Sequence, residues 1–474
     1  MWQRVLLGIW LGLMLVGTTG GDGVASWLRR GDALAAETRY AAATAAYLAA
    51  SRWDGADPMP YMRAGCIYLW QRRFAAAEAA LWQAHLAAPA ALEVWAALGD
   101  LELARGNPGL AARWYRQATQ AAPRRADLLA ALGEAALEVG DFDEAAASLS
   151  RALQLEPDLA AAQYRLGLVL ARQKPEAARI HLERACQGAD TQIAAQAEEM
   201  LMSLDEMAGI ENAAERAARL GLVYLRQEAW TLAEAQLAKA LVALPDSGEL
   251  RAYLGYALYQ RGEYGAAERE VRAALQLDPD NPQAHHFLAM IYRRLGWPRL
   301  ALESLARAYE LDSTSPAIAA EIAQSYADLG AYPEAETWFA QAAKLAPDDV
   351  SYLLLQAAFH IERAYHVAER GIPAAEAALA LQPAAADAHI LLGWGLYLVG
   401  RRDVAEAHMQ RALALNPMSA SAHFRIAELY AGSGRLPEAT SHYQRVIDLD
   451  TLGSLRERAL QALERLKSAR SLSP

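Results

Sequence analysis

The sequence predicts an all-α solenoid of about twelve stacked helical hairpins, followed at its C-terminal end by a capping helix. Three observations support this prediction: a period of 34 residues, small side chains at three fixed places in each period, and Gly or Pro where helices are expected to end. A fixed period of this length indicates stacked units that each contact their neighbours, rather than separate globular domains. The period is visible directly in Gly31, Gly65, Gly99, Gly133 and Gly167.

Small residues recur at three positions when each unit is numbered so that Gly255 is position 8. Position 8 is Gly or Ala in all twelve units, and positions 20 and 27 are each Ala in eleven units. Protein interiors are packed at nearly the density of organic crystals, so a methyl group or less at these positions indicates two helix axes in close approach. Larger residues such as Leu254 at position 7 and Leu237 at position 24 are expected to fill the space beside them.

The ends of both helices are also marked in the sequence. Position 15 is Gly in seven units, where a left-handed residue would end the first helix. Position 32 is Pro in eight units, just past the second helix, because Pro lacks the N–H that a continuing helix needs. Asn281 and Pro282 supply an N-cap and a first-turn Pro for the unit that follows.

These residues resemble the tetratricopeptide repeat family over roughly residues 24 to 453. The resemblance implies a right-handed superhelix whose concave groove binds a protein or peptide, and it implies neither a reaction nor a cofactor. We therefore expect a non-enzymatic scaffold. Two alternatives stay open: an exported glycan-binding or exopolysaccharide-assembly scaffold, and an accessory arm of an enzyme whose catalytic part is on another chain.

Residues 1–23 precede the repeats and are predicted to be a signal peptide or an N-terminal membrane anchor. Arg4 is followed by an uncharged apolar run from Val5 to Val16, a length that suits the core of a signal peptide better than a spanning helix. Cleavage is expected near Ala25. The protein is then extracytoplasmic or membrane-anchored, with the membrane contacted through this segment alone; the alternative is a cytoplasmic protein with an apolar first helix.

The repeats are expected in two blocks, 24–190 with repeats one to five and 214–453 with repeats six to twelve. Between them, residues 191–213 hold one extra helix and a linker, with Asp190 predicted to cap the start of the helix and Gly209 its end. An odd helix between hairpins predicts a bend or a crossing element, and a degenerate repeat absorbed smoothly is the alternative. Residues 454–474 form the C-terminal cap helix and tail.

Repeat ten is irregular because it has 36 residues and lacks the Gly at position 15 and the Ala at position 20. We predict one long helix from Ser351 to Arg370, a turn at Gly371 to Pro373, and a short second helix that ends at Leu381.

No catalytic, cofactor-binding or metal site is expected. A net charge of −11 argues against a nucleic-acid partner, which requires a basic surface. Cys66 and Cys186 lack cysteine partners at the spacing of a zinc or redox site. Two pairs of histidines also recur 34 residues apart, and equivalent positions of stacked repeats explain them without a metal; they are His389 with His423 and His408 with His442.

In the family, positions 2, 5, 9, 12 and 13 of each first helix form the groove wall. Position 5 is never Lys in this chain, so the clamp with which some family members hold a chaperone tail is absent. In repeat five these positions give Tyr164 and Arg172. We place the centre of the partner-binding wall in repeats seven to twelve, with Arg293 and Arg294 favouring an acidic segment. The predicted site residues are Tyr256, Tyr259, His286, Met290, Arg293, Arg294, Trp394, Tyr397 and Phe424.

Overall fold

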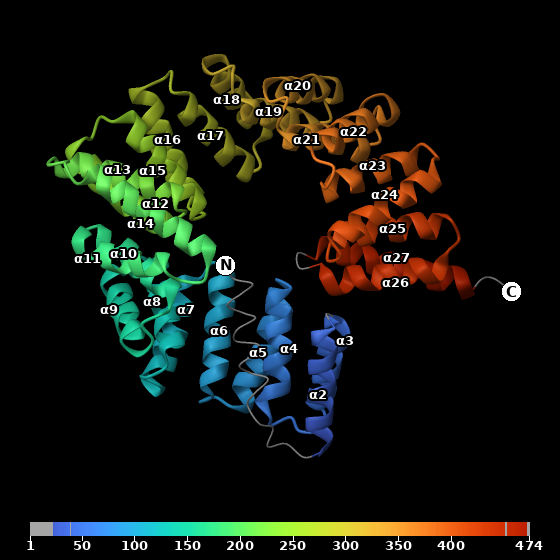
Figure 1. Ribbon diagram of the computed structural model, residues 1–474, viewed down its shortest axis with the longest axis horizontal. Helices are drawn as coiled ribbons and strands as arrows, with labels where there is room; N and C mark the ends of the chain where they lie inside the picture. Colours follow the sequence, from blue (N-terminus) through green and yellow to red (C-terminus); the bar gives the residue numbers. More distant parts are fainter. Residues whose placement is uncertain (1–21, 38, 451–452, 472–474) are drawn as a thin grey trace. The chain divides into compact units, whose positions relative to one another are not determined.

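The computed structural model describes residues 22–37, 39–450 and 453–471, and these residues form helices and no strand (Figure 1). Two consecutive helices make one repeat, and the predicted all-α solenoid of stacked hairpins is confirmed.

Repeats one to five comprise α2 (Asp22–Ala36), α3 (Tyr40–Ala50), α4 (Pro58–Trp70), α5 (Phe74–Ala87), α6 (Leu92–Ala104), α7 (Pro108–Ala121), α8 (Ala126–Val139), α9 (Phe142–Leu155), α10 (Ala160–Ala171) and α11 (Pro175–Cys186). The extra helix is α12 (Thr191–Met207). Repeats six to nine comprise α13 (Ala213–Arg226), α14 (Trp230–Ala243), α15 (Gly248–Gln260), α16 (Tyr264–Leu277), α17 (Pro282–Arg294), α18 (Pro298–Leu311), α19 (Pro316–Asp328) and α20 (Tyr332–Leu345). The remaining elements are α21 (Val350–Glu362), the π-helix η1 (Val367–Gly371), α22 (Ile372–Leu381), α23 (Ala386–Leu398), α24 (Arg402–Leu415), α25 (Ala420–Gly432), α26 (Leu436–Leu449) and α27 (Ser454–Ser471).

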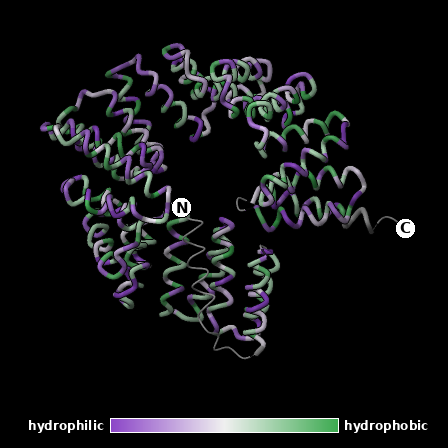
Figure 2. The backbone as a smooth tube through the Cα atoms, in the orientation of Figure 1, coloured by the Kyte–Doolittle hydropathy of each residue, from purple (hydrophilic) through white to green (hydrophobic). Residues whose placement is uncertain are grey.

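The small positions hold each hairpin together as predicted. A Cβ atom added to Gly65 would lie 2.7 Å from the Leu81 side chain, and one added to Gly221 would lie 2.8 Å from that of Leu237. Ala233 and Ala240, at positions 20 and 27, are fully buried. Figure 2 shows hydrophobic and hydrophilic stretches alternating along the helices, as expected for helices that bury one face.

The turn between the two helices of a repeat adopts the predicted left-handed conformation. Gly262, for example, has a φ angle of 81° at position 15. Among the repeats with a side chain at this position, Arg72, Glu228 and Ala364 have φ angles between 51° and 55°. These three residues occupy a region that costs an L-residue free energy.

Contacts divide the described residues into two compact units. One unit consists of the residues up to Arg105 together with those from Ala346 onward, and the other is Gly106–Leu345. The chain therefore leaves the first unit after α6 and returns to it at α21.

In the second unit, the extra helix α12 changes the way in which the repeats stack. Asp190 caps α12 by accepting hydrogen bonds from two backbone N–H groups, as predicted, but the helix ends at Met207 without a left-handed residue at Gly209. After α12, repeat six packs on repeat five and also reaches repeat four, which is not its neighbour in sequence. The Tyr224 hydroxyl donates to the Leu168 carbonyl at 2.6 Å, and α14 contacts α8. These contacts favour the crossing element over a smoothly absorbed repeat.

The prediction for repeat ten was wrong about the first helix. α21 ends at Glu362, and a loop with left-handed Ala364 and His366 leads into η1. His360 is fully buried and its Nδ1 lies 3.0 Å from the Tyr365 carbonyl, so this side chain holds the loop. The predicted turn at Gly371 to Pro373 was also wrong, because Gly371 is the last residue of η1 and continues directly into α22. A Cβ added there would meet Ile361 at 2.8 Å. Gly371 therefore serves as the small residue at position 20, where this repeat lacks Ala. The residues that make this repeat longer than 34 lie before Gly371.

The first unit brings the first and last repeats into contact. The backbone N–H of Ala41 donates to Oδ1 of Asp448 at 3.2 Å, although 407 residues separate them. The Gln71 side chain donates to the Asp448 carbonyl at 3.3 Å. Asp448 and Gln71 are both buried, so these contacts form a buried interface between the first two repeats and the last one; we call it the seam. On the other side of the last repeat, α27 packs against α26 and α25, in agreement with its predicted role as a cap.

The predicted signal peptide or anchor lies outside the described residues, apart from its last two positions. α2 already begins at Asp22, and Val24 and Ala25 are buried in the core of repeat one. Among the described residues, no helix combines the length and the hydrophobicity needed to cross a membrane.

Candidate partner-binding surfaces

Side chains on neighbouring first helices meet in pairs separated by 31 residues. Arg63 donates to Asp32 at 2.6 Å, and Arg165 donates to Glu134 at 2.8 Å. Two further pairs join an aromatic ring to its neighbour, Tyr256 with Phe287 and Trp394 with Arg425. In each pair, position 9 of one repeat contacts position 6 of the next. The predicted wall therefore contains position 6 as well, and its signal in the sequence is the recurrence of complementary side chains at this spacing.

Tyr256 lies at the centre of an aromatic cluster in the second unit. Its ring stacks on Phe287 with the centroids 4.7 Å apart, and the edge of Trp230 meets it at 5.9 Å. Its hydroxyl accepts a hydrogen bond from Gln260 at 2.7 Å. All three rings are half-buried, so neighbours fix their orientation while part of each surface stays accessible.

His286 and Arg293 converge on one carboxylate that was not among the residues predicted from the sequence. Nε2 of His286 lies 3.0 Å from Oε1 of Glu321, and Nη1 of Arg293 lies 3.5 Å from Oε2. Burial acts to raise the pKa of Glu321, but the hydrogen bond from His286 and the charge of Arg293 outweigh it and lower this pKa below its usual value. The Arg293 side chain is 42% exposed, so its guanidinium can also reach a ligand.

Tyr259 and Arg294 both contact Tyr264, the first residue of α16. The rings of Tyr259 and Tyr264 are 5.6 Å apart, and Nε of Arg294 donates to the Tyr264 hydroxyl at 2.9 Å. Met290 is half-buried on α17. The structure thus places six predicted site residues on α15 and α17, together with Phe287 and Glu321; we call this set the α15–α19 wall.

The other three predicted residues belong to the first unit, on α23 and α25. Trp394 stacks on Tyr397 at 4.9 Å, and the guanidinium of Arg425 lies 4.4 Å from the Trp394 ring. The Tyr397 hydroxyl packs against Gly432, where an added Cβ would come within 2.1 Å. Trp394 and Tyr397 are half-buried and held on several sides.

Phe424 differs from the other predicted residues because it is 3% exposed. Its ring meets the edge of Tyr443, and Arg458 of α27 covers it at 4.4 Å. In this structure Phe424 is a core residue beneath the capping helix, and it offers almost no surface to a partner.

The predicted wall positions of repeat five are occupied by the chain itself. Tyr164 is 5% exposed and donates to the side-chain oxygen of Gln227 at 2.6 Å. Arg172 lies 3.7 Å above the Phe142 ring. Gln227 follows α13 directly, so repeat six covers this part of the wall and excludes a partner from it.

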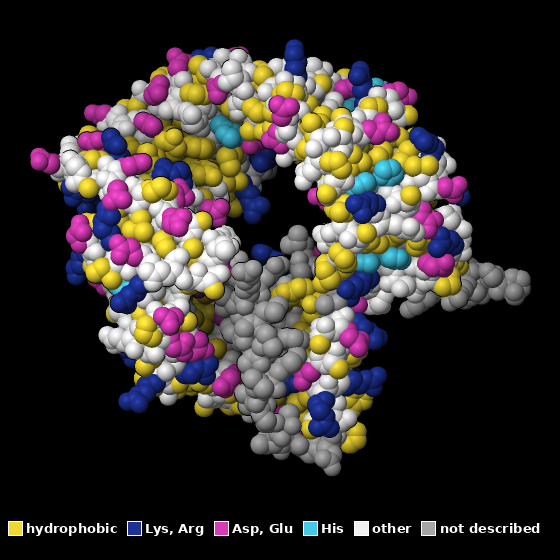
Figure 3. Space-filling view, in the orientation of Figure 1, with side chains coloured by type: hydrophobic (Ala, Val, Ile, Leu, Met, Phe, Trp, Pro, Cys, Tyr) yellow, Lys and Arg dark blue, Asp and Glu magenta, His cyan; other side chains and the backbone are white. Residues whose placement is uncertain are grey.

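The four recurring histidines form two pairs, each between the two helices of one hairpin. Nδ1 of His389 is 2.9 Å from Nδ1 of His408, and the equivalent distance between His423 and His442 is 2.8 Å. Figure 3 shows His side chains gathered in two patches over α23–α26. In the part of the chain that the structure describes, no three His, Cys, Asp or Glu residues are grouped for metal binding.

Comparisons with known proteins agree with the repeat architecture. Family models described as Tetratricopeptide repeat match residues 295–359 and 392–453, and one described as TPR repeat matches residues 137–174 and 255–296. No curated protein matches the chain.

Several solved structures are similar to it. A tetratricopeptide repeat protein from Parabacteroides merdae has 15% identity over 52% of this chain and 97% of that one, with a TM-score of 0.43. Naa15/Naa10 bound to HypK-THB has 13% identity, coverage of 95% and 97%, and a TM-score of 0.42. Yeast Tom70 has 16% identity, coverage of 80% and 96%, and a TM-score of 0.32. From the repeats in the sequence, the stacked hairpins and the three matching family models, we conclude that this chain is a tetratricopeptide repeat protein.

Proposed function

We propose that this protein is a non-enzymatic scaffold, exported or tethered to a membrane by its N-terminal segment, which binds another polypeptide on the α15–α19 wall. The tetratricopeptide repeats support protein interaction as its general role. The observation that carries the proposal for this wall is the joint presence of fixed, half-exposed aromatic rings and two exposed arginines. Side chains already held by neighbours lose little conformational freedom on binding, so more of the contact energy remains as affinity.

Charge indicates the kind of segment that would bind. Arg293 and Arg294 are adjacent and exposed on a protein with a net charge of −11. An acidic segment would be attracted to this pair, and rim charges of this type mainly accelerate association. The partner proposed for the wall is therefore an acidic polypeptide with apolar anchors.

The alternative of glycan binding requires an aromatic face open to a sugar ring. Gln260 beside Tyr256 supplies the carboxamide that such a site would use. However, one face of Tyr256 stacks on Phe287 and the edge of Trp230 also contacts its ring. These contacts favour a polypeptide whose side chains fit between the rings.

A photo-crosslinking amino acid at position 293 tests the proposal. In extracts of the source cells, the variant should capture a polypeptide, whereas the same amino acid at the exposed Ala306 of α18 should capture little. Digestion of the captured material with a protease or with glycosidases distinguishes protein from glycan. Capture should fall when Arg294→Glu is added and stay unchanged with Arg411→Glu, an equal charge reversal on α24. Equal capture from both positions, or captured glycan, would contradict the proposal.

Export has its own test. Because the positive residue Arg4 precedes the apolar run, the rest of the chain should lie on the far side of the membrane. A C-terminal fusion to a reporter enzyme that is active only outside the cytoplasm should be active, and deletion of residues 2–16 should abolish its activity. An active cytoplasmic reporter at the same position would refute export.

A further inference from the structure

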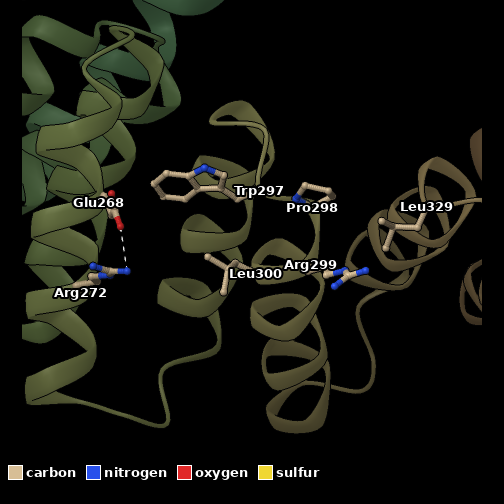
Figure 4. Close-up of a pocket in the computed structure, with 7 residues that line it drawn as sticks. All are labelled: Glu268, Arg272, Trp297, Pro298, Arg299, Leu300 and Leu329. Carbon is tan, nitrogen blue, oxygen red and sulfur yellow. Dashed lines mark ion pairs between the residues drawn. The ribbon is translucent and has the colours of Figure 1, made fainter.

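A cavity of about 690 Å³ opens on the second unit among α16, α18 and the end of α19. Figure 4 shows the Trp297 ring directed toward the helix that carries Glu268 and Arg272, with Leu300 beside it, while Arg299 extends on the other side toward Leu329. None of these residues is a predicted wall residue on a first helix. The cavity is therefore a second surface, and its role does not depend on the function proposed for the wall.

Large apolar side chains are exposed together at this cavity. Trp297 is 45% exposed, Leu329 41% and Leu300 40%, and Pro298 lines the same space. Isolated exposed apolar residues are ordinary on a protein surface, but several that converge on one hollow mark an interaction site. The volume is within the range of about 300–1,000 Å³ that is typical of ligand pockets.

Buried contacts hold the cavity in shape. Tyr292, 5% exposed, accepts a hydrogen bond from Nη2 of Arg272 at 2.8 Å, and its ring lies 5.7 Å from that of Trp297. Arg272 also pairs with Glu268 at 3.0 Å. The Trp297 and Arg272 sides of the cavity are thus joined through one buried tyrosine.

The charges at the cavity do not cancel. Glu268 neutralises Arg272, whereas Arg299 has no ion pair or hydrogen bond to any other residue that the structure describes. A bound group that brings an apolar side chain and a carboxylate would fill the hollow and pair with Arg299. A small-molecule site normally adds several converging polar groups, and this cavity has few.

We propose that this cavity binds a polypeptide segment in which a bulky apolar side chain is next to an acidic residue, with Trp297, Leu300 and Leu329 around the apolar side chain and Arg299 paired with the carboxylate. Aromatic residues and arginine are the types that contribute most to binding energy at protein interfaces.

The test uses the full chain labelled with fluorotryptophan and three synthetic peptides. The probe is acetyl-Asp-Glu-Leu-Phe-Asp-amide; one control replaces its acidic residues with Lys, and another replaces Leu and Phe with Ala. The chain contains twelve tryptophans, so the fluorine NMR signal of Trp297 is assigned as the one missing from Trp297→Phe. We expect only the acidic apolar peptide to shift this signal saturably.

Variants then assign the contacts. Arg299→Glu should weaken binding of the acidic peptide at least tenfold, and Leu300→Ala several-fold, while Arg411→Glu should leave the affinity unchanged. The replaced side chains are exposed, so thermal unfolding should match that of the parent protein and exclude loss of fold as the cause.

Three outcomes would overturn the proposal: no saturable shift at millimolar peptide, equal binding of the acidic and basic peptides, or equal weakening by Arg299→Glu and Arg411→Glu. A Trp297 signal that shifts with protein concentration alone would instead show a second copy of the chain in the cavity, and this would overturn it as well.

Discussion

The imidazole rings of His423 and His442 face each other with their Nδ1 atoms 2.8 Å apart. The carbonyl of Pro417, 3.1 Å from Nε2 of His423, can only accept a hydrogen bond, so this nitrogen donates its proton there. Nδ1 of a neutral His423 must then accept from Nδ1 of His442. A second proton on His423 would occupy Nδ1 and remove the acceptor that this arrangement needs. His389 and His408, in the preceding repeat, have the same geometry.

These pairs predict a loss of stability in mild acid. Burial is the main cause that lowers the pKa of His423 to about 4, and burial also lowers the pKa values of His408 and His442. Below about pH 6.5 the unfolded chain therefore binds protons that the folded chain does not, so stability present above that pH is lost as the pH falls toward 4. With the partial exposure of His423 taken into account, its share is on the order of 1–2 kcal/mol.

Urea unfolding at pH 7.5 and pH 5 would measure this loss. The double variant His423→Gln with His442→Gln should depend less on pH than the parent. His285→Gln is the matched control, because His285 makes the same kind of contact, with the Pro279 carbonyl, at the equivalent position without a second histidine. Identical pH dependence in all three proteins would exclude the pair as the cause.

Glu228→Gly is expected to stabilise the protein. Glu228 has a φ angle of 55° at the turn where most repeats have Gly. Removal of the side chain relieves a left-handed strain of about 1–2 kcal/mol, and the greater freedom of unfolded Gly offsets part of it, so a gain of about 0.5–1 kcal/mol should appear in urea titrations. Gly262→Ala, the reverse change at φ 81°, should destabilise. Effects of the same sign from both variants would contradict the explanation.

Ala240→Leu should be costly because Ala240 is fully buried where the helices of repeat six approach. Overpacking there should destabilise the protein by about 1–3 kcal/mol. A change at the exposed turn residue Glu263, such as Glu263→Gln, should stay within about 0.5 kcal/mol. Chemical denaturation of both variants would measure the difference, and equal effects would rule out the positional scheme.

Asp448→Ala should weaken the packing of α3, which lies near the other end of the sequence. Asp448 accepts the Ala41 N–H, and its loss would leave this half-buried donor without its partner at a cost of about 1 kcal/mol. Hydrogen exchange should therefore accelerate in α3, roughly 400 residues away in sequence, as well as in α26. Asp450→Ala is the control, because Asp450 accepts from the Arg456 N–H close to it in sequence. Faster exchange confined to α26 would show that the seam does not hold α3.

Interactions within one hairpin could be predicted because they depend on residues close together in sequence. A small residue such as Gly65 needs Leu81 beside it whatever the distant chain does, and Gly262 ends its helix for reasons of local backbone geometry. The same periodicity led to the prediction that Tyr256, His286 and Arg293 lie on first helices of adjacent repeats, and the structure has them on α15 and α17.

The tertiary structure decided which surfaces remain accessible. Tyr164 is covered by repeat six, Phe424 by α27, and Asp448 meets Ala41. The contact of Tyr164 with repeat six depends on how the chain crosses at α12, that of Phe424 on how α27 packs on α25 and α26, and that of Asp448 on how the last repeat meets the first. A period of 34 residues specifies none of these three packings. Position 6 was missed because it contributes to the wall through the neighbouring repeat, so Phe287 and Glu321 acquire their roles only when the hairpins are stacked.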